Sequence, residues 1–341
     1  MDPHPFGGES RIFVEVIRWR HRLRIDFHVR VADPDPRVID PAQISVPAPY
    51  AARALTAVDA QAVFEVIAAD EFDQIGRVAI EVEDIIGDWQ RPSFSLADST
   101  IGVFLGDELV GYAEHSGHDR GDAAVHPAHR GRGIGRQLAL WMQNKARSRG
   151  ASVVGMPVPE GGVADRALAD WGYRVRWHSW ILQLPEGAEI APRPLPAGYV
   201  ARAATESDYA AMHDVLEDAF LEWSVRDRES YADFLARTVD RPGRQPWMLR
   251  VVTDTEGAVV AAACLVLSDN KECYVDRLAT RADQRNRGIA QALLADSFAA
   301  GRHNGALTSG LSTDSRTGAL GLYEKVGMVV TDNWVNRAIE L

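Results

Sequence analysis

The sequence has little cysteine, no long apolar stretch and no excess of positive charge. Cys264 and Cys273 are its only cysteines, and their spacing fits neither a CxxC redox pair nor a set of zinc ligands. This scarcity indicates a reducing compartment. No eighteen apolar residues run together, and residues 1–10 lack a basic start followed by an apolar segment. We therefore expect a cytoplasmic protein that makes no membrane contact.

Charge and composition narrow the class of protein further. Lys and Arg total 37 against 48 Asp and Glu, which gives a net charge of −11. Such a balance argues against a protein that tracks nucleic-acid phosphates, so no nucleic-acid partner is expected. With 46% hydrophobic and 25% charged residues, the composition is that of a globular protein and excludes disordered, collagen-like and disulfide-scaffold classes. A length of 341 residues predicts about two domains.

An internal repeat organises the chain. Three segments recur in the same order: Tyr50–Asp59 as Tyr199–Asp208, Arg130–Gly135 as Arg285–Ala290, and Trp171–Tyr173 as Val326–Met328. Three matches in one order indicate two copies of one fold. In both copies a threonine, Thr56 or Thr205, stands three residues before an aspartate, which predicts the N-cap of a helix with an acid in its first turn.

The repeat divides the chain into four parts. Residues 1–47 precede it and form an N-terminal β-hairpin extension, because apolar and polar residues alternate from Leu23 to Val31 and Ile12–Trp19 supplies a partner strand. Residues 48–184 form the first copy and residues 198–341 the second. The prolines of residues 185–197 predict an extended linker between them.

Each copy reads as strands mixed with helices, which predicts an α/β (α+β) layer fold. In the first copy we expect strands at 101–105, 109–114 and 152–158, and a long helix over about 134–149 that Gly150 ends. The second copy repeats this helix from Ile289.

The sharpest chemical feature is the Arg/Gly-rich turn before this helix. The start of a helix attracts anions, and glycine lets phosphate oxygens approach the backbone. Arg130, Arg132, Arg285 and Arg287 add positive charge at the two turns. The sequence lacks the Gly-Lys-Ser/Thr of a P-loop, and the first copy lacks the G-x-G-x-x-G spacing of a dinucleotide site. The simpler alternative is a turn that only caps a helix, but its recurrence favours anion binding.

These residues carry a resemblance. The pattern Val-x-Pro-x-x-Arg-Gly-x-Gly-Ile-Gly, residues 125–135, resembles the acyl-CoA pyrophosphate loop of the GNAT acetyltransferase superfamily. The resemblance covers residues 48–184 and 198–341, and the layout is similar to that of tandem enzymes such as mycothiol synthase. It implies two GNAT domains, each a mixed twisted sheet flanked by helices, that bind acetyl-CoA as acyl donor without a metal. The residues it implies for cofactor binding are Val125, Arg130, Gly131, Arg132, Gly133, Ile134 and Gly135 in the first copy, and Leu278, Ala279, Thr280, Arg285, Asn286, Arg287, Gly288, Ile289 and Ala290 in the second.

The two copies differ where the family suggests a catalytic tyrosine. Four residues before the shared glycine, the second copy has Tyr323 and the first has Leu168. The first copy keeps Pro127 and Gly131 in its loop, where the second has Ala282 and Asn286. Our hypothesis is that the second copy is catalytic, with Tyr323 as general acid, and that the first binds acyl-CoA without turnover or is structural. The alternative for Tyr323 is a buried aromatic residue that packs its helix onto the sheet.

Other site residues follow from position. Asp276, on the strand that enters the second loop, is the first candidate for the general base and Glu272 the next; either also fits a solvated acid at a strand end. Glu222 and Trp223 join the early helices, which in this superfamily line the acceptor site, so they are candidates for contact with the substrate. The acceptor is expected to be a small-molecule or peptide amine. Two other functions stay open, a non-enzymatic acyl-CoA sensor and mycothiol synthase, and the edge strands of such a sheet allow a homodimer.

Two further clusters are weaker candidates. Four histidines, His115, His118, His126 and His129, lie close in sequence but lack the regular spacing of metal ligands, so no metal is expected. The basic run from Arg18 to Arg24 fits a solvated hairpin turn, with an anionic partner as the alternative.

Overall fold

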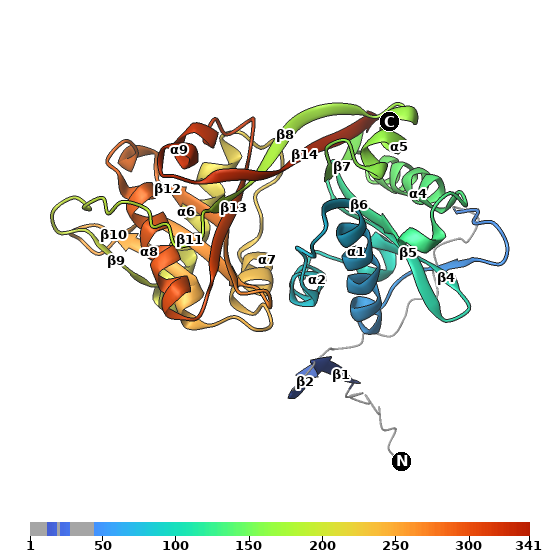
Figure 1. Ribbon diagram of the computed structural model, residues 1–341, viewed down its shortest axis with the longest axis horizontal. Helices are drawn as coiled ribbons and strands as arrows, with labels where there is room; N and C mark the ends of the chain where they lie inside the picture. The colour runs from blue at the N-terminus through green and yellow to red at the C-terminus, as the bar shows by residue number, and fades with distance from the viewer. Residues whose placement is uncertain (1–11, 19–20, 28–43) are drawn as a thin grey trace, which may run out of the picture.

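The structure is a computed structural model that describes residues 12–18, 21–27 and 44–341. Within these ranges the chain forms a two-stranded hairpin and one sheet of twelve strands with helices on its faces (Figure 1). Strands β1 (Ile12–Arg18) and β2 (His21–Phe27) pair antiparallel, which confirms the predicted hairpin. Its tip and residues 28–31 lie outside the described residues. No helix in the described part of the chain is both long and apolar enough to cross a membrane.

The two copies contain the same elements in the same order. The first copy consists of β3 (Ala51–Arg53), α1 (Ala60–Ile75), α2 (Val82–Trp89), α3 (Leu96–Ser99), β4 (Thr100–Leu105), β5 (Glu108–Gly117), β6 (Arg120–Val125), α4 (Ile134–Ser148), β7 (Val153–Pro159), α5 (Val163–Asp170) and β8 (Arg174–Leu184). The second consists of β9 (Val200–Ala203), α6 (Tyr209–Leu221), α7 (Tyr231–Phe234), a π-helical turn η5 (Leu235–Val239), β10 (Leu249–Thr253), β11 (Val259–Leu267), β12 (Glu272–Thr280), α8 (Ile289–His303), β13 (Thr308–Asp314), α9 (Leu320–Lys325) and β14 (Val329–Glu340). The strands and the long helix expected from the sequence are all present.

The predicted helix starts are capping boxes. The backbone N–H of Thr56 donates to the Asp59 carboxylate at 2.8 Å, and that of Thr205 donates to Asp208 at 2.7 Å. Each aspartate also pairs with an arginine of the preceding strand, so the equivalent acids anchor the first helix of each copy to its sheet. A cap of this kind contributes about 1 kcal/mol.

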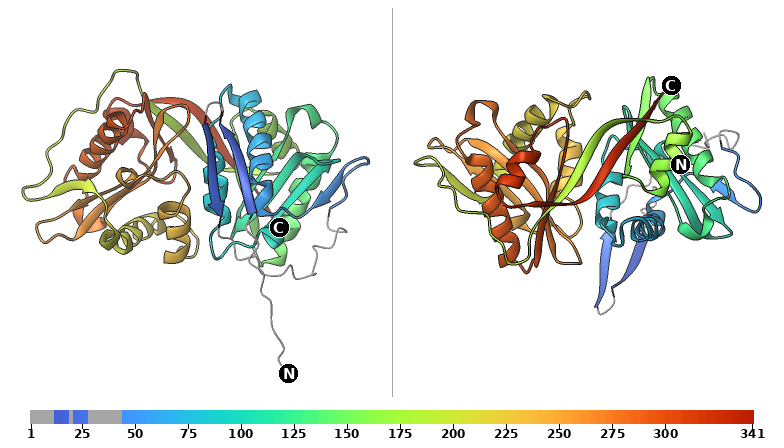
Figure 2. Two further views of the ribbon diagram at one scale, coloured as in Figure 1. Left: turned by 90° about the horizontal axis from the view of Figure 1, so that it is seen from below. Right: turned by 45° about the horizontal axis from the view of Figure 1, so that its top comes forward.

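Strand pairing crosses the linker between the copies. The sheet order is β3-β4-β5-β6-β7-β14-β8-β13-β12-β11-β10-β9, so the last strand of each copy lies inside the other copy's half of the sheet. β14 pairs with β7 from Trp334↔Pro159 to Glu340↔Val153, and β8 pairs with β13 from Leu184↔Ser309 to Ser179↔Asp314. Figures 1 and 2 show β8 and β14 running together from one half to the other. The copies have reciprocally exchanged their final strands.

The cores follow this exchange. In the first copy α1 and α2 pack on one face of the sheet and α4 on the other, and α6, α7 and α8 repeat this arrangement in the second copy. Val335 of β14 is buried in the first copy's core, and Leu182 of β8 is buried in the second copy's core. Each copy's core therefore includes apolar side chains from the last strand of the other copy.

Further contacts join the faces that carry α2 and α7. Arg241 donates to Asp84 at 2.8 Å, and the His118 imidazole lies 2.9 Å from the Asp227 carboxylate. An ion pair between Arg77 and Asp332 also bridges the halves. The His118–Asp227 contact holds the loop between α6 and α7, and Trp223 of this loop lines the site described next.

Candidate functional site

Two neighbouring strands of the second copy part and open the sheet. β12 and β13 pair in parallel only from Glu272↔Thr308 to Val275↔Leu311. At the next residue β12 carries a β-bulge: Cys264 of β11 pairs with Arg277, the following Leu265 pairs with Val275, and Asp276 is left without a partner in β11. A bulge bends its strand, and the backbone groups of β12 that face β13 beyond Val275 lose their ladder partners. The opening exposes these groups to a ligand.

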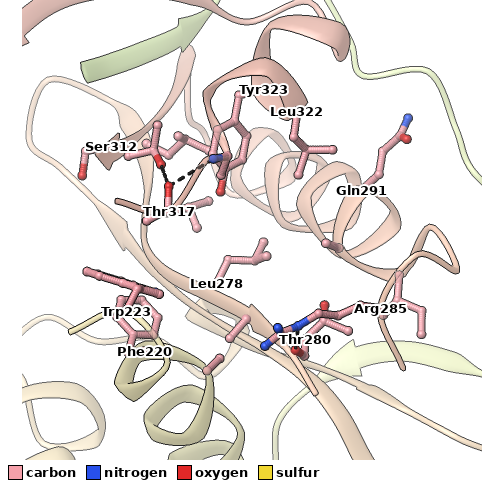
Figure 3. A pocket seen from close by; sticks show the side chains of 18 of the residues that line it. Phe220, Trp223, Leu278, Thr280, Arg285, Gln291, Ser312, Thr317, Leu322 and Tyr323 are labelled. Carbon is pink, nitrogen blue, oxygen red and sulfur yellow. Dashed lines mark hydrogen bonds between the residues drawn. The ribbon is translucent and has the colours of Figure 1, made fainter. Parts of the chain in front are cut away.

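A pocket of about 720 Å³ occupies this opening. Its walls are the parted ends of β12 and β13, the C-terminal end of α6, the N-terminal end of α8, and α9 (Figure 3). The predicted site residues that line it are Glu222, Trp223, Asp276, Leu278, Ala279, Thr280, Arg285, Asn286, Gly288, Ile289, Ala290 and Tyr323. Residues from distant parts of the second copy are thus brought to one cavity.

The turn before α8 keeps its shape despite the loss of a glycine. Asn286 has φ +61°, close to φ +74° at Gly131, and Gly288 has φ +79° as the N-cap of α8. Asparagine tolerates the left-handed region better than most residues, so it can replace glycine here. The first-turn N–H groups of α8 have no partner within the helix, and Gly288 adds no side chain over them. The turn therefore has the backbone geometry of an anion cradle.

The arginines of the two turns are held by neighbouring side chains. Arg285 donates two hydrogen bonds to Glu222, at 2.6 and 2.7 Å, and this pairing lowers the pKa of the Glu222 carboxyl. Arg130 pairs in the same way with Asp70 and Asp73 on α1. Both arginines thus tie the turn to the first long helix of their copy. Glu222 reaches the pocket, but its carboxylate is engaged at the turn.

The second pair of arginines contacts tyrosines instead. Arg287 donates to the Tyr199 hydroxyl at 2.9 Å, and its guanidinium lies 5.0 Å from the centre of that ring. Arg132 donates to the Tyr50 hydroxyl at 2.6 Å in the first copy. These contacts tie each turn to the segment before the first strand of its copy, and among the described residues neither guanidinium has a carboxylate partner at ion-pair distance.

Hydroxyl groups gather where the strands part. Tyr323 projects from α9 into the pocket, toward the side of Thr317 and Ser312 (Figure 3). Burial raises the pKa of the Tyr323 phenol, so it keeps its proton at neutral pH. Thr280 is 7% exposed, and its hydroxyl is a buried group without a hydrogen-bond partner in the described structure. A buried hydroxyl that lines a pocket and lacks a partner is suited to bind a polar ligand.

The two acids proposed as general base occupy different places. Asp276 projects from the bulge, lines the pocket and is 51% exposed, with Arg277 at 3.7 Å as its ion-pair partner. Glu272 lies at the start of β12 where the strands are still paired, and accepts a hydrogen bond from Gln183 at 2.9 Å. Glu272 is absent from the pocket lining. Of the two, Asp276 has the position from which a carboxylate can reach a ligand.

An aromatic wall closes the side of the pocket near α6. Trp223 lies 5.3 Å from Phe220, ring centre to ring centre, and Arg316 sits between two tryptophans. Its guanidinium is 4.7 Å from the centre of Trp223 and 3.6 Å from that of Trp177 on β8. Ser179, also on β8, lines the pocket directly. The first copy's last strand therefore contributes to the second copy's site.

The corresponding region of the first copy lacks these polar groups. Leu168, in the place of Tyr323, is 4% exposed and part of the apolar core. By the alignment of the two loops, Val125 takes the place of Thr280. Gln74 of α1 lies so close to Gly162 that a side chain there would collide with it, which brings α1 against the turn before α5. The Trp171 ring packs near Gly135, at the start of α4. Apolar side chains thus stand where the second copy places the hydroxyl groups of Tyr323 and Thr280.

In the described structure, the four histidines that lie close in sequence do not share a common partner; the contacts of three of them are as follows. His115 bonds the carbonyl of His118, His118 contacts Asp227, and His129 lies 3.0 Å from the Tyr50 hydroxyl. Among the residues that the structure describes, no group of three or more His, Cys, Asp or Glu is arranged to hold a metal ion.

Several pocket residues were not predicted as site residues from the sequence, among them three with hydroxyl groups. Ser312 and Thr317 lie beyond the Arg/Gly motif, and their hydroxyls carry no motif of their own. The strand alternation of β13 was the only signal for Ser312. Ser179 belongs to the first copy in sequence, so no local pattern places it in this pocket.

Comparison with known proteins adds three findings. A family model for the acetyltransferase (GNAT) family matches residues 64–172 and 209–328. No match to a curated protein is found. A solved GCN5-related N-acetyltransferase from Sphaerobacter thermophilus is similar, with 25% identity, a TM-score of 0.66, and coverage of 87% of this chain and 97% of that one.

Two other solved structures share the fold at lower identity. A tandem GNAT protein from the clavulanic acid biosynthesis pathway is 17% identical, with a TM-score of 0.64 and coverage of 85% of this chain and 98% of that one. An N-myristoyltransferase of Saccharomyces cerevisiae with bound myristoyl-CoA is 12% identical, with a TM-score of 0.62 and coverage of 88% and 82%. The last strands and the pocket described above therefore lie within a fold that is known in tandem form.

Proposed function

The chain belongs to the GNAT acetyltransferase family, a family of acyltransferases, and on that premise we propose that it is an acetyl-CoA-dependent N-acetyltransferase whose second copy carries out the reaction. The observation that carries this proposal is the pocket of the second copy, which joins an anion cradle to the hydroxyl of a half-buried tyrosine. The first copy has a leucine in the place of that tyrosine. It acts as a structural partner that supplies β8 to the active half.

The residues of the pocket fit an acyl-CoA donor. The turn at residues 285–290 and the first N–H groups of α8 would hold the pyrophosphate of the donor. They combine a helix N-terminus with an arginine, Arg285, that Glu222 holds in place. The unpaired face of β12 beyond Val275 offers backbone groups to the amides of the pantetheine arm. Thr280 adds a hydroxyl that has no other partner. The donor supplies the thioester that the acceptor amine attacks.

Tyr323 would act as the general acid. A thiol has a pKa of about 8.5, so a departing thiolate is stabilised by a nearby O–H donor. The phenol is suited to this task because burial raises its pKa and keeps it protonated. Its position on α9, over the point where β12 and β13 part, supports contact with the leaving sulfur.

Asp276 would accept the proton of the amine. A primary ammonium group has a pKa of about 10.4 and becomes a nucleophile only after it loses a proton. The Asp276 carboxylate lines the pocket and is half exposed, so it can take the proton directly or through one water molecule. The wall of Trp223 and Phe220 borders the same end, which suits a small-molecule or peptide amine with an apolar part.

The test measures release of free thiol from acetyl-CoA across a panel of primary amines. The variant Tyr323→Phe should lower kcat about 100-fold and leave the affinity for acetyl-CoA unchanged, since it removes only the proton donor. The matched control is Tyr231→Phe, a tyrosine that is 40% exposed and outside the pocket, and this variant should keep full activity. Wild-type turnover by Tyr323→Phe would refute the assigned role. Tight stoichiometric binding of acetyl-CoA with no turnover of any amine would instead favour an acyl-CoA sensor.

A further inference from the structure

The linker between the copies lies along the helix that begins at the anion cradle. Ile190 is buried in the second copy's core, and Leu195 packs against the same core, so the linker is held on both sides of its central prolines. Gln291 of α8 reaches the carbonyl of Ala191 at 3.5 Å. Further along the helix, Arg302 forms an ion pair with Glu189 at 3.2 Å. The linker is thus a strap fixed to α8.

This strap carries one arginine to the start of the helix. Arg193 stands between Pro192 and Pro194, whose rings restrict the backbone on both sides. Its side chain lies against Gly288, the N-cap of α8, so closely that a Cβ at residue 288 would collide with it. Its Nη1 donates to Gln291 at 3.4 Å, and Arg193 lines the pocket. The glycine therefore leaves room for a guanidinium as well as for an anion.

Arg193 differs from the first arginine of the turn in its partners. Arg285 is neutralised by Glu222, whereas within the described ranges Arg193 has no carboxylate at ion-pair distance. A free guanidinium beside a helix N-terminus lacks the anion that would complete it. Of the two arginines that line the pocket, Arg285 and Arg193, the linker arginine is therefore the one whose charge is not paired with a carboxylate in the described structure.

At the equivalent position the first copy has no cation. Its segment before β3 also lies against the long helix, because the N–H of Ser45 reaches Gln137 of α4 at 3.4 Å. Arg193 stands seven residues before β9, and the residue seven before β3 is Ile44, which is buried in the core. The two copies thus differ at this position: the second copy has Arg193 beside its pocket, and the first has a buried isoleucine.

We propose that Arg193 of the inter-copy linker is a ligand of the pyrophosphate of the acyl-CoA donor in the second copy. The proposal rests on the function proposed above. The guanidinium would bind a phosphate oxygen while the first N–H groups of α8 bind another. Donor binding would then fix the linker more firmly against α8.

The experiment compares three full-length proteins, the wild type, Arg193→Ala and Arg302→Ala, by calorimetric titration with CoA. Arg302→Ala is the matched control, since it removes the other arginine that ties the linker to α8 but lies outside the pocket lining. We expect Arg193→Ala to bind CoA about tenfold more weakly and Arg302→Ala to bind like the wild type. Thermal melting of each variant verifies that it is folded.

The same titration with 3′-dephospho-CoA identifies the group that is bound. A contact with the pyrophosphate predicts the same loss of affinity for this ligand, whereas a loss restricted to CoA would assign Arg193 to the 3′-phosphate and overturn the proposal. Equal binding of CoA by Arg193→Ala and the wild type would also overturn it. Failure of the wild type to bind CoA at all would contradict the proposed function itself, so the two failures are distinguishable.

Discussion

Leu182 tests the strand exchange, because it belongs to the first copy in sequence and to the second in space. The side chain is fully buried in the core formed with β11, β13 and α8. Replacement of a buried leucine by alanine costs about 3 kcal/mol, from the lost transfer free energy and the cavity that remains. Exchange therefore predicts that Leu182→Ala destabilises the second copy more than the first.

Native-state hydrogen exchange resolves the two copies. Leu182→Ala should speed exchange of the protected amides of α8 by about 100-fold, with a smaller effect in α4, because local opening follows the core that loses contacts. Val335→Ala is the mirror variant. Its side chain is 2% exposed in the first copy's core, so it should loosen α4 by about 2 kcal/mol and α8 by less.

Val175→Ala provides the control on the same strand as Leu182. That side chain is 39% exposed, so its truncation should change neither helix by a measurable amount. The reasoning is refuted if Leu182→Ala loosens α4 and leaves α8 protected, because this would place β8 with its own copy.

Two further predictions concern stability and the shape of the turn. Burial raises the pKa of the Glu114 carboxyl to about 7, so the folded state binds a proton that the unfolded chain releases near its ordinary pKa of about 4.5. Its contribution to the free energy of unfolding should therefore fall as pH rises from about 4.5 to 7, and urea titrations at several pH values should show a weaker decline in Glu114→Gln. At the turn, Asn286→Gly should bind CoA like the wild type. Asn286→Ala should have a free energy of unfolding about 1 kcal/mol lower, because alanine is strained at φ +61°. Equal stability of the two variants in urea titrations would contradict this prediction.

Much of the local structure could be predicted from the sequence, since its signals act over a few residues. Spacing alone predicted the two capping boxes, which are formed by Thr56 with Asp59 and by Thr205 with Asp208. Gly150, at φ +78°, ends the long helix as expected. The membership of Thr280 and Tyr323 in one cavity was anticipated by resemblance to a family, and not by any local pattern.

Other parts of the site depended on contacts between distant segments. Glu222 was expected to meet the acceptor, but its carboxylate is held by Arg285, and only the packing of α6 beside the turn brings them together. The sequence did not indicate that Arg193 belongs to the site. A proline-rich segment predicts an extended chain but does not show which surface the chain lies on. The family resemblance implies a splay between two central strands, but the residue at which β12 leaves β13, beside the bulge at Asp276, was not predicted from the sequence.

The sequence by itself determined that this protein has two copies of one fold, an N-terminal hairpin and an arginine- and glycine-rich turn in each copy. Repeats, the alternation of apolar and polar residues, and helix caps can be recognised from residues that are close in sequence. Recognising them requires no knowledge of which strands are neighbours in the sheet. Only the tertiary structure decided that β8 and β14 change places. Backbone hydrogen bonds join strands whatever their distance in sequence, and each of the two strands buries apolar side chains in the other copy's core. The pocket of the second copy is consequently built with Ser179 of the first.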